Sequence, residues 1–323
     1  MARITMREAI SQALWEEMER DPNIFIMGEE VGVWGGTYAV TKGFYDHFGG
    51  KRVRDTPIAE AAIVGAAVGA AMKGLKPVAE IMTINFAFVA FEQIVNEMPK
   101  FHYMFGGQFN VPVVVRTVSG GGRQLGATHS QPPDAIFAHF PGLVVVAPGT
   151  PADAKGMLKS ALRTKNPVLF IEHATLYQTR GEVPEGDYVV PLGKSTVQRP
   201  GSDVTIVTYS KMLDLSMKAA DQLAQDGIEA EGIGLRTLRP LGMEPVIESF
   251  KKTNRAVIVE ESWKSYGVGA EVESRIYEQA FDYADAPIQR VAQVEVPLPY
   301  NRALEQMALP QIEDIIAAVK EVV

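Results

Sequence analysis

The pattern of apolar and polar residues predicts an alternation of helices and buried strands. Near the start, Thr5 stands three residues before Glu8, and Ile10, Leu14 and Met18 then recur at four-residue spacing. This arrangement combines a capping box with an amphipathic period, so it predicts a helix. Apolar runs of strand length follow, separated by stretches typical of helices or loops, at residues 23–27, 78–82, 111–118, 143–147 and 168–171.

These apolar runs are continuous rather than alternating, which is typical of strands buried on both faces of a parallel sheet. The pattern lapses over residues 178–203, which are rich in proline, glycine and charge and therefore read as a linker. A second, shorter series begins with a strand at 204–209. Because 323 residues also exceed the usual size of one core, we predict an α/β protein of two parallel-sheet domains, at 1–186 and 187–323.

The predicted helix at residues 60–73 carries small residues along two neighbouring stripes. Glycine inside a helix costs about 1 kcal/mol relative to alanine, so the pattern indicates that another backbone approaches closely. The approaching element could belong to the same subunit or to a partner, and spacing alone does not separate the two. The stripes are Ala61, Gly65 and Gly69, and Ala62, Ala66 and Ala70.

Composition and charge exclude several classes of function. The net charge is −8 and basic residues cluster no further than pairs such as Lys251-Lys252, so we expect no nucleic-acid partner. The longest apolar run, at 61–72, is too short to span a bilayer, and the first residues lack the apolar core of a signal peptide, so we expect a cytoplasmic protein. There is no cysteine, which leaves His, Glu, Asp or a cofactor for the chemistry.

Two glycine motifs are incomplete phosphate-binding loops. Gly267-Val268-Gly269 resembles a dinucleotide fingerprint, but Val272 occupies the position of the third glycine. Gly193-Lys194-Ser195 could end a P-loop only if residue 188 were glycine, and it is Tyr188. We therefore interpret both motifs as turns.

His129 is a candidate catalytic residue. Gly120-Gly121-Gly122 follows the predicted strand 111–118 and leads to His129, at the end of a parallel strand where ligands bind in this class of fold. A histidine there could transfer a proton, while backbone amides stabilise a developing charge. The alternative is a loop histidine without a function.

Glu60 is the second candidate and stands at the start of the small-residue helix. A carboxylate in a first turn stabilises the helix dipole by at most about 1 kcal/mol, and this role needs no ligand. The apolar neighbours Ile58, Ala59 and Val64 would also desolvate Glu60 and raise its pKa, as in a proton-transferring acid. Both roles are compatible with the sequence.

Taken together, motifs along nearly the whole chain resemble the beta subunits of thiamine-dependent 2-oxo acid dehydrogenases, in particular the pyruvate dehydrogenase decarboxylating component, within the transketolase-like enzymes. The order of the matches is more specific than any one of them. They are Met27-Gly28-Glu29-Glu30-Val31, Asp55-Thr56-Pro57-Ile58 with Glu60, Glu80-Ile81-Met82-Thr83 with Asn85-Phe86, His129-Ser130-Gln131, Pro141-Gly142-Leu143, Asp153-Ala154-Lys155-Gly156, Leu235-Arg236-Thr237-Leu238-Arg239-Pro240 and Gly267-Val268-Gly269-Ala270-Glu271.

The resemblance implies a transketolase-like pyrimidine-binding domain followed by a transketolase C-terminal-like domain, and a role for each candidate. Glu60 would bond to N1′ of thiamine diphosphate and so promote deprotonation at C2. Phe86 would stack on the pyrimidine ring and Met82 would line the cofactor. His129 would assist proton transfer or the reductive acetylation of lipoyl groups that follows oxidative decarboxylation of pyruvate.

The resemblance also implies partners. Relatives bind the diphosphate through magnesium with a Gly-Asp-Gly motif, whereas the only Gly-Asp here, Gly186-Asp187, precedes Tyr188. The diphosphate and magnesium would therefore be held by an alpha subunit in an alpha2-beta2 heterotetramer. The C-terminal domain would dock onto the core of a lipoyl-bearing dihydrolipoyl acyltransferase, and the small-residue helix would lie at a subunit interface.

Some relatives hold a structural potassium ion, mostly through backbone carbonyls. An aspartate often found at the position of Thr164 is absent, although a carbonyl ligand would survive that change. Relatives also commonly carry aspartate at the position of Glu92. The corresponding potassium ligands are Val113, Ala161, Leu162, Thr164 and Asn166.

Three alternatives to this function remain at the level of sequence. A nicotinamide or flavin oxidoreductase would need the glycine fingerprint that neither domain carries intact. A non-catalytic interaction subunit would use Glu60 only at the helix terminus. Within the family, beta subunits of branched-chain 2-oxo acid and acetoin dehydrogenases share almost every motif.

Overall fold

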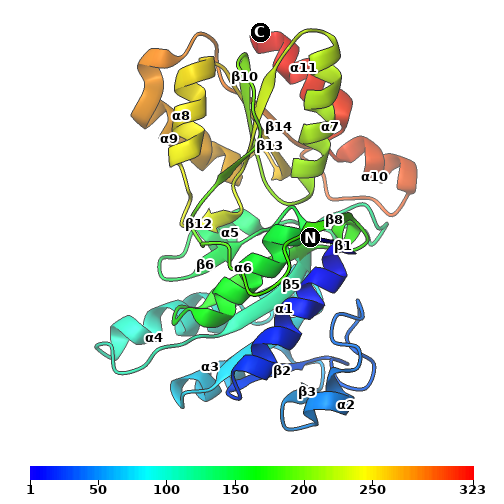
Figure 1. Cartoon of the computed structure of the whole chain (residues 1–323), viewed down its shortest axis with the longest axis vertical. Helices are drawn as coiled ribbons and strands as arrows, with labels where there is room; N and C mark the ends of the chain where they lie inside the picture. Colours follow the sequence, from blue (N-terminus) through cyan, green and yellow to red (C-terminus); the bar gives the residue numbers. More distant parts are fainter. The chain divides into compact units, whose positions relative to one another are not determined.

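The computed structural model describes all residues, Met1–Val323, which divide into two compact units (Figure 1). The first unit comprises Met1–Ser119 with Ile136–Leu192, and the second comprises Gly120–Ala135 with Gly193–Val323. Each unit contains a mainly parallel sheet, so the predicted α/β fold class is confirmed. The predicted boundary at residue 186 stays a prediction, and it differs from these units in leaving segment 120–135 with the first domain.

The sheet of the first unit is parallel throughout, because helices connect its strands. All side chains of its central strands β5 and β7 are buried, which explains their continuous hydrophobic pattern. A short antiparallel pair joins β1 (Ala2–Thr5) to β8 (Arg180–Val183). The parallel strands run in the order β6 (Val144–Val146), β7 (Val168–His173), β5 (Val114–Ser119), β4 (Lys76–Ile81), β2 (Ile24–Gly28) and β3 (Val53–Asp55).

Helices α1 (Met6–Arg20) and α6 (Pro151–Arg163) lie side by side in the first unit (Figure 1). The predicted capping box is present, because Thr5 Oγ1 accepts from Glu8 N at 3.2 Å and Thr5 N donates to Glu8 Oε2 at 2.7 Å. The other helical segments of this unit are α2 (Phe44–Phe48), α3 (Glu60–Met72), a 3₁₀ helix (Ile84–Phe88), a π-helical turn (Gln93–Glu97), α4 (Met98–Met104) and a 3₁₀ turn (Ala174–Leu176). The short helix α5 (Asp134–Ala138) begins where the chain returns from the second unit to the first.

In the second unit, helices cover both faces of the sheet. Figure 1 shows α7 (Lys211–Gln225) and α11 (Ile312–Val322) on one face, and α8 (Glu244–Thr253) and α9 (Val268–Ala280) on the other. The sheet order is β14 (Gln289–Gln293), β13 (Ala256–Trp263), β10 (Val204–Thr208), β11 (Ala230–Gly234) and β9 (Thr196–Arg199), of which only β9 is antiparallel. Further short elements are β12 (Thr237–Arg239), a 3₁₀ turn (Phe281–Tyr283) and α10 (Arg302–Ala308).

The segment predicted as a linker, residues 178–203, contains ordered strands. Both β8 and β9 lie within it, and each pairs with a strand elsewhere in its own unit. Its proline and glycine content marks turns between short edge strands rather than an unstructured connection. No helix of the chain is both long enough and apolar enough to cross a bilayer.

A buried ion cluster connects the central strands of the first unit. The guanidinium of Arg116 on β5 bonds to both carboxylate oxygens of Glu172 on β7, at 2.6 and 2.9 Å, and to Glu80 Oε2 on β4 at 2.6 Å. The Tyr177 hydroxyl donates to Glu172 at 2.5 Å. Burial raises the pKa of Glu80, an effect that Arg116 opposes. Burial alone would lower the pKa of Arg116, but the two carboxylates raise it above its usual value.

Removing the cation from this cluster should strongly destabilise the first unit. Arg116→Met leaves two buried carboxylates without their shared donor, and breaking a buried pair in this way costs about 3–5 kcal/mol. The exposed pair Lys194–Glu244, at 3.3 Å, provides the control, because Lys194→Met should change the free energy of unfolding little. Urea unfolding followed by circular dichroism measures the free energy of unfolding of both variants. Equal losses in the two variants would contradict a stabilising role for the Arg116 cluster.

Candidate functional site

Glu60 is a buried carboxylate without a bonding partner in its own chain. Glu60 is the first residue of α3, and only 6% of its surface is exposed. No hydrogen bond or ion pair within the chain involves this carboxylate, and the N-cap residue Ala59 provides no side-chain cap. Because the residue is buried while its carboxylate makes no bond within the chain, the carboxylate is free to bind a ligand.

A second carboxylate, Glu29, lies close enough to Glu60 to interact with its charge. Glu29 directly follows β2, is 7% exposed, and its Oε1 atom is buried without a hydrogen-bond partner. Burial raises the pKa of Glu29, and the negative charge of Glu60 raises it further. In the sequence, Glu29 stands out only as part of the motif Met27-Gly28-Glu29-Glu30-Val31. Its position directly after a buried parallel strand was the signal that could have identified it.

Asp55 fixes the two segments that carry these carboxylates. Asp55 Oδ1 accepts a hydrogen bond from Gly32 N at 2.6 Å, and a Cβ at Gly32 would lie 2.7 Å from the same carboxylate. Thr56 N also donates to Gly28 O at 2.9 Å. The loop after β2 is therefore tied to the segment before α3, which restricts Glu29 and Glu60 to one arrangement.

Met82 and Phe86 lie beyond the carboxyl end of β4, the strand that pairs with β2. Both side chains are partly exposed, whereas the neighbouring residues Thr83 and Asn85 are buried. Thr83 Oγ1 donates to Val118 O at 3.2 Å, which anchors this turn to β5. Thus Glu60, Met82 and Phe86 belong to the same unit, and they follow β3 and β4, the two strands that flank β2 in one sheet.

The small-residue face of α3 is only partly covered, since the helix contacts the π-helical turn Gln93–Glu97 near Gly65. Ala62, Ala66 and Gly69 are exposed, and a Cβ added at Gly69 would meet no atom within 4 Å. A Cβ at Gly65 would meet only the flexible side chain of Gln93, at 3.6 Å. Close packing within the subunit therefore does not explain the exposed small residues Ala62, Ala66 and Gly69.

His129 belongs to the second unit and is exposed. Its Nδ1 atom lies 2.8 Å from Thr128 Oγ1, and its backbone N–H donates to Gly126 O at 3.3 Å. The glycine-rich segment before it is held by two buried carboxylates, Glu261 and Glu305. Sequence reasoning missed both, because they are more than a hundred residues away along the chain.

Gly267-Val268-Gly269 forms the N-cap and first turn of helix α9 rather than the turn that was predicted, and its surroundings do not suit a phosphate. A Cβ at Gly267 or Gly269 would lie 2.6 or 2.5 Å from Glu260 Oε1, and that atom accepts a hydrogen bond from Gly269 N at 3.1 Å. A carboxylate therefore occupies the place where a dinucleotide phosphate would bind, and it would repel one. Gly193 likewise has a positive φ of 77° and contacts the ring of Pro240.

Three of the five predicted potassium ligands lie at the end of α6. Ala161 and Leu162 lie in its last turn, where carbonyls lack helical partners, and Thr164 follows as the C-cap residue. Asn166 N donates to Thr164 Oγ1 at 3.2 Å, and Val113 O accepts from Val168 N at 2.9 Å. No group of three or more His, Asp or Glu side chains in the chain is placed to bind a metal ion.

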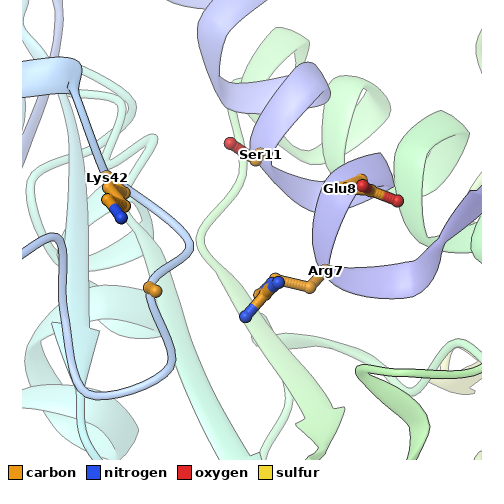
Figure 2. A pocket seen from close by; sticks show the side chains of 5 residues that line it. Arg7, Glu8, Ser11 and Lys42 are labelled. Atoms are coloured by element: carbon orange, nitrogen blue, oxygen red, sulfur yellow. The ribbon is translucent and has the colours of Figure 1, made fainter.

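A separate cavity of about 300 Å³ lies in the first unit between α1 and the loop after β2 (Figure 2). It is lined by Arg7, Glu8, Ser11, Ala39 and Lys42. The Glu8 carboxylate already accepts hydrogen bonds from Thr5 in the capping box. None of the predicted site residues lines this cavity.

Comparisons with known proteins cover almost the whole chain. Residues 2–180 match the model of the transketolase pyrimidine-binding domain, and residues 193–315 match that of the transketolase C-terminal domain. The chain is 50% identical over 319 residues to the pyruvate dehydrogenase E1 component subunit beta of Rickettsia felis, covering 99% of this chain and 98% of that protein. It is 47% identical to the mitochondrial pyruvate dehydrogenase E1 component subunit beta-2 of Oryza sativa, and the match covers 98% of this chain and 85% of that protein.

A solved structure described as a split gene transketolase, an inactive beta4 tetramer, is also similar. Its TM-score is 0.81 at 26% sequence identity, covering 99% of this chain and 98% of that chain. The similarity extends over both units, so the predicted transketolase-like fold is confirmed.

Titration of Glu29 should make the stability of the free chain depend on pH. Because its pKa is raised on folding, the folded chain keeps a proton that the unfolded chain releases, and stability is lost as pH rises above the usual value of 4.5. Glu29→Gln should remove this loss, so the variant should gain stability relative to wild type as the pH rises above 4.5. Urea unfolding across this range provides the measurement. The exposed neighbour Glu30 provides the control, because Glu30→Gln should follow the wild-type curve.

Proposed function

The chain belongs to the family of pyruvate dehydrogenase E1 component beta subunits, and on this premise we propose that it forms the pyrimidine side of a thiamine diphosphate site. The proposal rests on one observation above all, the buried and unpartnered carboxylate of Glu60. The buried and unpaired Oε1 of Glu29 beside it also fits a polar ligand. Both residues would be poorly explained if they served only the fold.

Glu60 would hold a proton at ring N1′ of the cofactor. When bound, thiamine diphosphate supplies a nucleophilic C2 carbon that attacks the carbonyl of a 2-oxo acid. Burial and the neighbouring charge of Glu60 raise the pKa of Glu29, so a proton kept on Glu29 would lie beside the carboxylate proposed to bind N1′. Phe86 would stack on the pyrimidine ring, and Met82 would line its edge.

The diphosphate and its magnesium would be held by an alpha subunit in an alpha2-beta2 heterotetramer. Two features support this division: the chain lacks a Gly-Asp-Gly motif, and none of its His, Asp or Glu groups is placed for a metal ion. The exposed small residues on α3, such as Ala66 and Gly69, would let a partner helix approach closely. The similar split gene transketolase is described as inactive as a beta4 tetramer, which agrees with a need for a second kind of subunit.

Pyruvate is the proposed 2-oxo acid, because the curated relatives above are named for it. Branched-chain and acetoin dehydrogenases remain the alternatives within the same fold. The acetyl group would pass to a lipoyl-bearing dihydrolipoyl acyltransferase core, with the chain acting in the cytoplasm. Potassium would bind Ala161, Leu162, Thr164 and Asn166, at and after the end of α6, together with Val113 before β5, mostly through backbone carbonyls.

Glu60→Gln provides the decisive test of cofactor activation. The substitution keeps the shape of the side chain but removes its ionisable group, so proton exchange at C2 of bound thiamine diphosphate should slow by about 10²–10⁴-fold. Hydrogen–deuterium exchange at C2, measured by NMR in the assembled alpha–beta enzyme, isolates this step from later transfer to lipoyl groups. The exposed residue Glu248 provides the matched control through Glu248→Gln. An unchanged exchange rate in Glu60→Gln would rule out the role proposed for Glu60. The alternative of a non-catalytic interaction subunit would then be favoured.

His129→Ala should affect a different step. If His129 transfers a proton or assists acyl transfer, turnover should fall by about 10²–10⁴-fold while C2 exchange and assembly remain unchanged. A steady-state assay with pyruvate and a lipoyl domain, run beside C2 exchange, separates these effects. His139→Ala removes another exposed histidine and should leave turnover unaltered. Normal turnover in assembled His129→Ala would identify His129 as a loop residue without a catalytic role.

A further inference from the structure

The backbone of the glycine loop, defined here as residues 120–126, is bound by carboxylates that come from far along the chain. Glu305 Oε1 accepts from Gly122 N at 3.0 Å and from Gln124 N at 3.1 Å. Its Oε2 accepts from Gln124 N at 3.1 Å and from Gln124 Nε2 at 2.9 Å. Glu261 Oε1 accepts from Gly121 N at 2.6 Å. All these residues belong to the second unit.

Glu305 is fully buried, at 0% exposure, and no lysine or arginine pairs with it. The amides of the glycine loop therefore take the place of a cation. A loop conformation that withdrew these amides would leave a buried charge without donors, and such a state is strongly disfavoured. The carboxylate thus selects one conformation of the loop.

The glycines allow the loop to lie directly on the segment that carries Glu305. A Cβ at Gly121 would lie 2.6 Å from a methyl carbon of Leu298, and a Cβ at Gly126 would lie 2.5 Å from the ring of Tyr300. Gln124 has a positive φ of 54°, which is uncommon for a residue with a side chain. This backbone persists because Glu305 binds both the amide and the side chain of Gln124.

The supporting segment is itself fixed by local capping. Asn301 Oδ1 accepts from Ala303 N at 2.9 Å and from Leu304 N at 3.2 Å, which sets the start of α10 and the direction of Glu305. On the other side of the loop, Ser262 Oγ donates to Pro132 O at 3.1 Å. The stretch that includes His129 is therefore held at both ends.

We propose that Glu305, assisted by Glu261, is a positioning residue for His129. The connection runs through Gly126, which ends the glycine loop and whose carbonyl accepts from His129 N at 3.3 Å. This inference rests on the proposed function only in that His129 acts in the reaction. Loosening the loop lowers the fraction of time that His129 spends in its productive place, so it reduces kcat without altering the activation step that belongs to Glu60.

The first test compares Glu305→Gln with Glu313→Gln in the assembled alpha–beta enzyme. Glutamine has one acceptor oxygen and places an amide group against loop amides, so kcat should fall by about 10–100-fold while the KM for pyruvate and the C2 exchange rate stay near wild type. Glu313 is exposed and makes no hydrogen bond or ion pair in the chain, so Glu313→Gln should behave as wild type. Unchanged kcat in Glu305→Gln would overturn the proposal.

A double-mutant cycle provides a readout that general destabilisation would not mimic. Once His129 is absent, its position no longer matters, so Glu305→Gln should cause no further loss in the His129→Ala background. Additive losses would overturn the proposal, because Glu305 would then act through another group. If His129→Ala itself has normal turnover, positioning of His129 is refuted as well, whereas the exchange test at Glu60 still decides the cofactor site.

Amide hydrogen exchange tests the structural step without any assay of activity. In Glu305→Gln, the amides of Gly122 and Gln124 should exchange faster than in wild type, whereas those of β10 should not change. Equal protection of the two loop amides would overturn the proposal. If Glu305→Gln fails to fold, Gln124→Ala removes only the two hydrogen bonds of the exposed Gln124 side chain, to Glu305 Oε2 and to Gly122 O. It should lower kcat by a smaller factor, and this loss should also vanish in the His129→Ala background.

Discussion

A carboxylate that leaves water needs a cation or hydrogen-bond donors, and this requirement shapes both units of the chain. Glu172 obtains its donors from Arg116 and Tyr177, across the middle of a sheet. Glu260 uses the amide of Gly269 and the guanidinium of Arg290. In each case, the partners come from different elements, so the buried charge holds those elements together.

The carboxylates near the proposed cofactor site break this rule. Glu60 has no bonding partner in the chain, and Glu29 retains a buried oxygen without one. Glu260 also keeps one buried oxygen, Oε2, without a partner, but its other oxygen is bonded, whereas Glu60 has no hydrogen bond or ion pair within the chain. The structure of this subunit alone therefore distinguishes carboxylates whose bonds stabilise the fold from Glu60 and Glu29, which can still bind a ligand.

Local patterns predicted well wherever the determining residues are close in sequence. The capping box of Thr5 and Glu8 and the continuous apolar runs identified α1 and the parallel strands. The glycine loop was assigned only by its position after a strand, because its binding partner Glu305 is 181 residues from Gln124. No local period could show that the glycines accommodate a leucine and a tyrosine from the end of the chain.

The same limit applies to two other features. Gly267 and Gly269 resemble a nucleotide motif in sequence, but the group that approaches them is the side chain of Glu260. The stretch 178–203 looks like a linker because edge strands are short and flanked by proline and glycine, and the pairing of β8 and β9 depends on distant partners. The sequence therefore indicated where glycine and proline give the backbone an unusual conformation. The structure identified which side chains and strands contact that backbone.

The dependence of the glycine loop on Glu305 also orders the events of biosynthesis. During translation, the loop leaves the ribosome long before residue 305 has been made, and its amides must remain with water until α10 exists. The positive φ of Gln124 has no stabilising carboxylate during that interval. The segment that carries His129 is therefore among the last parts of the nascent chain to reach its final conformation, although it lies in the first half of the sequence.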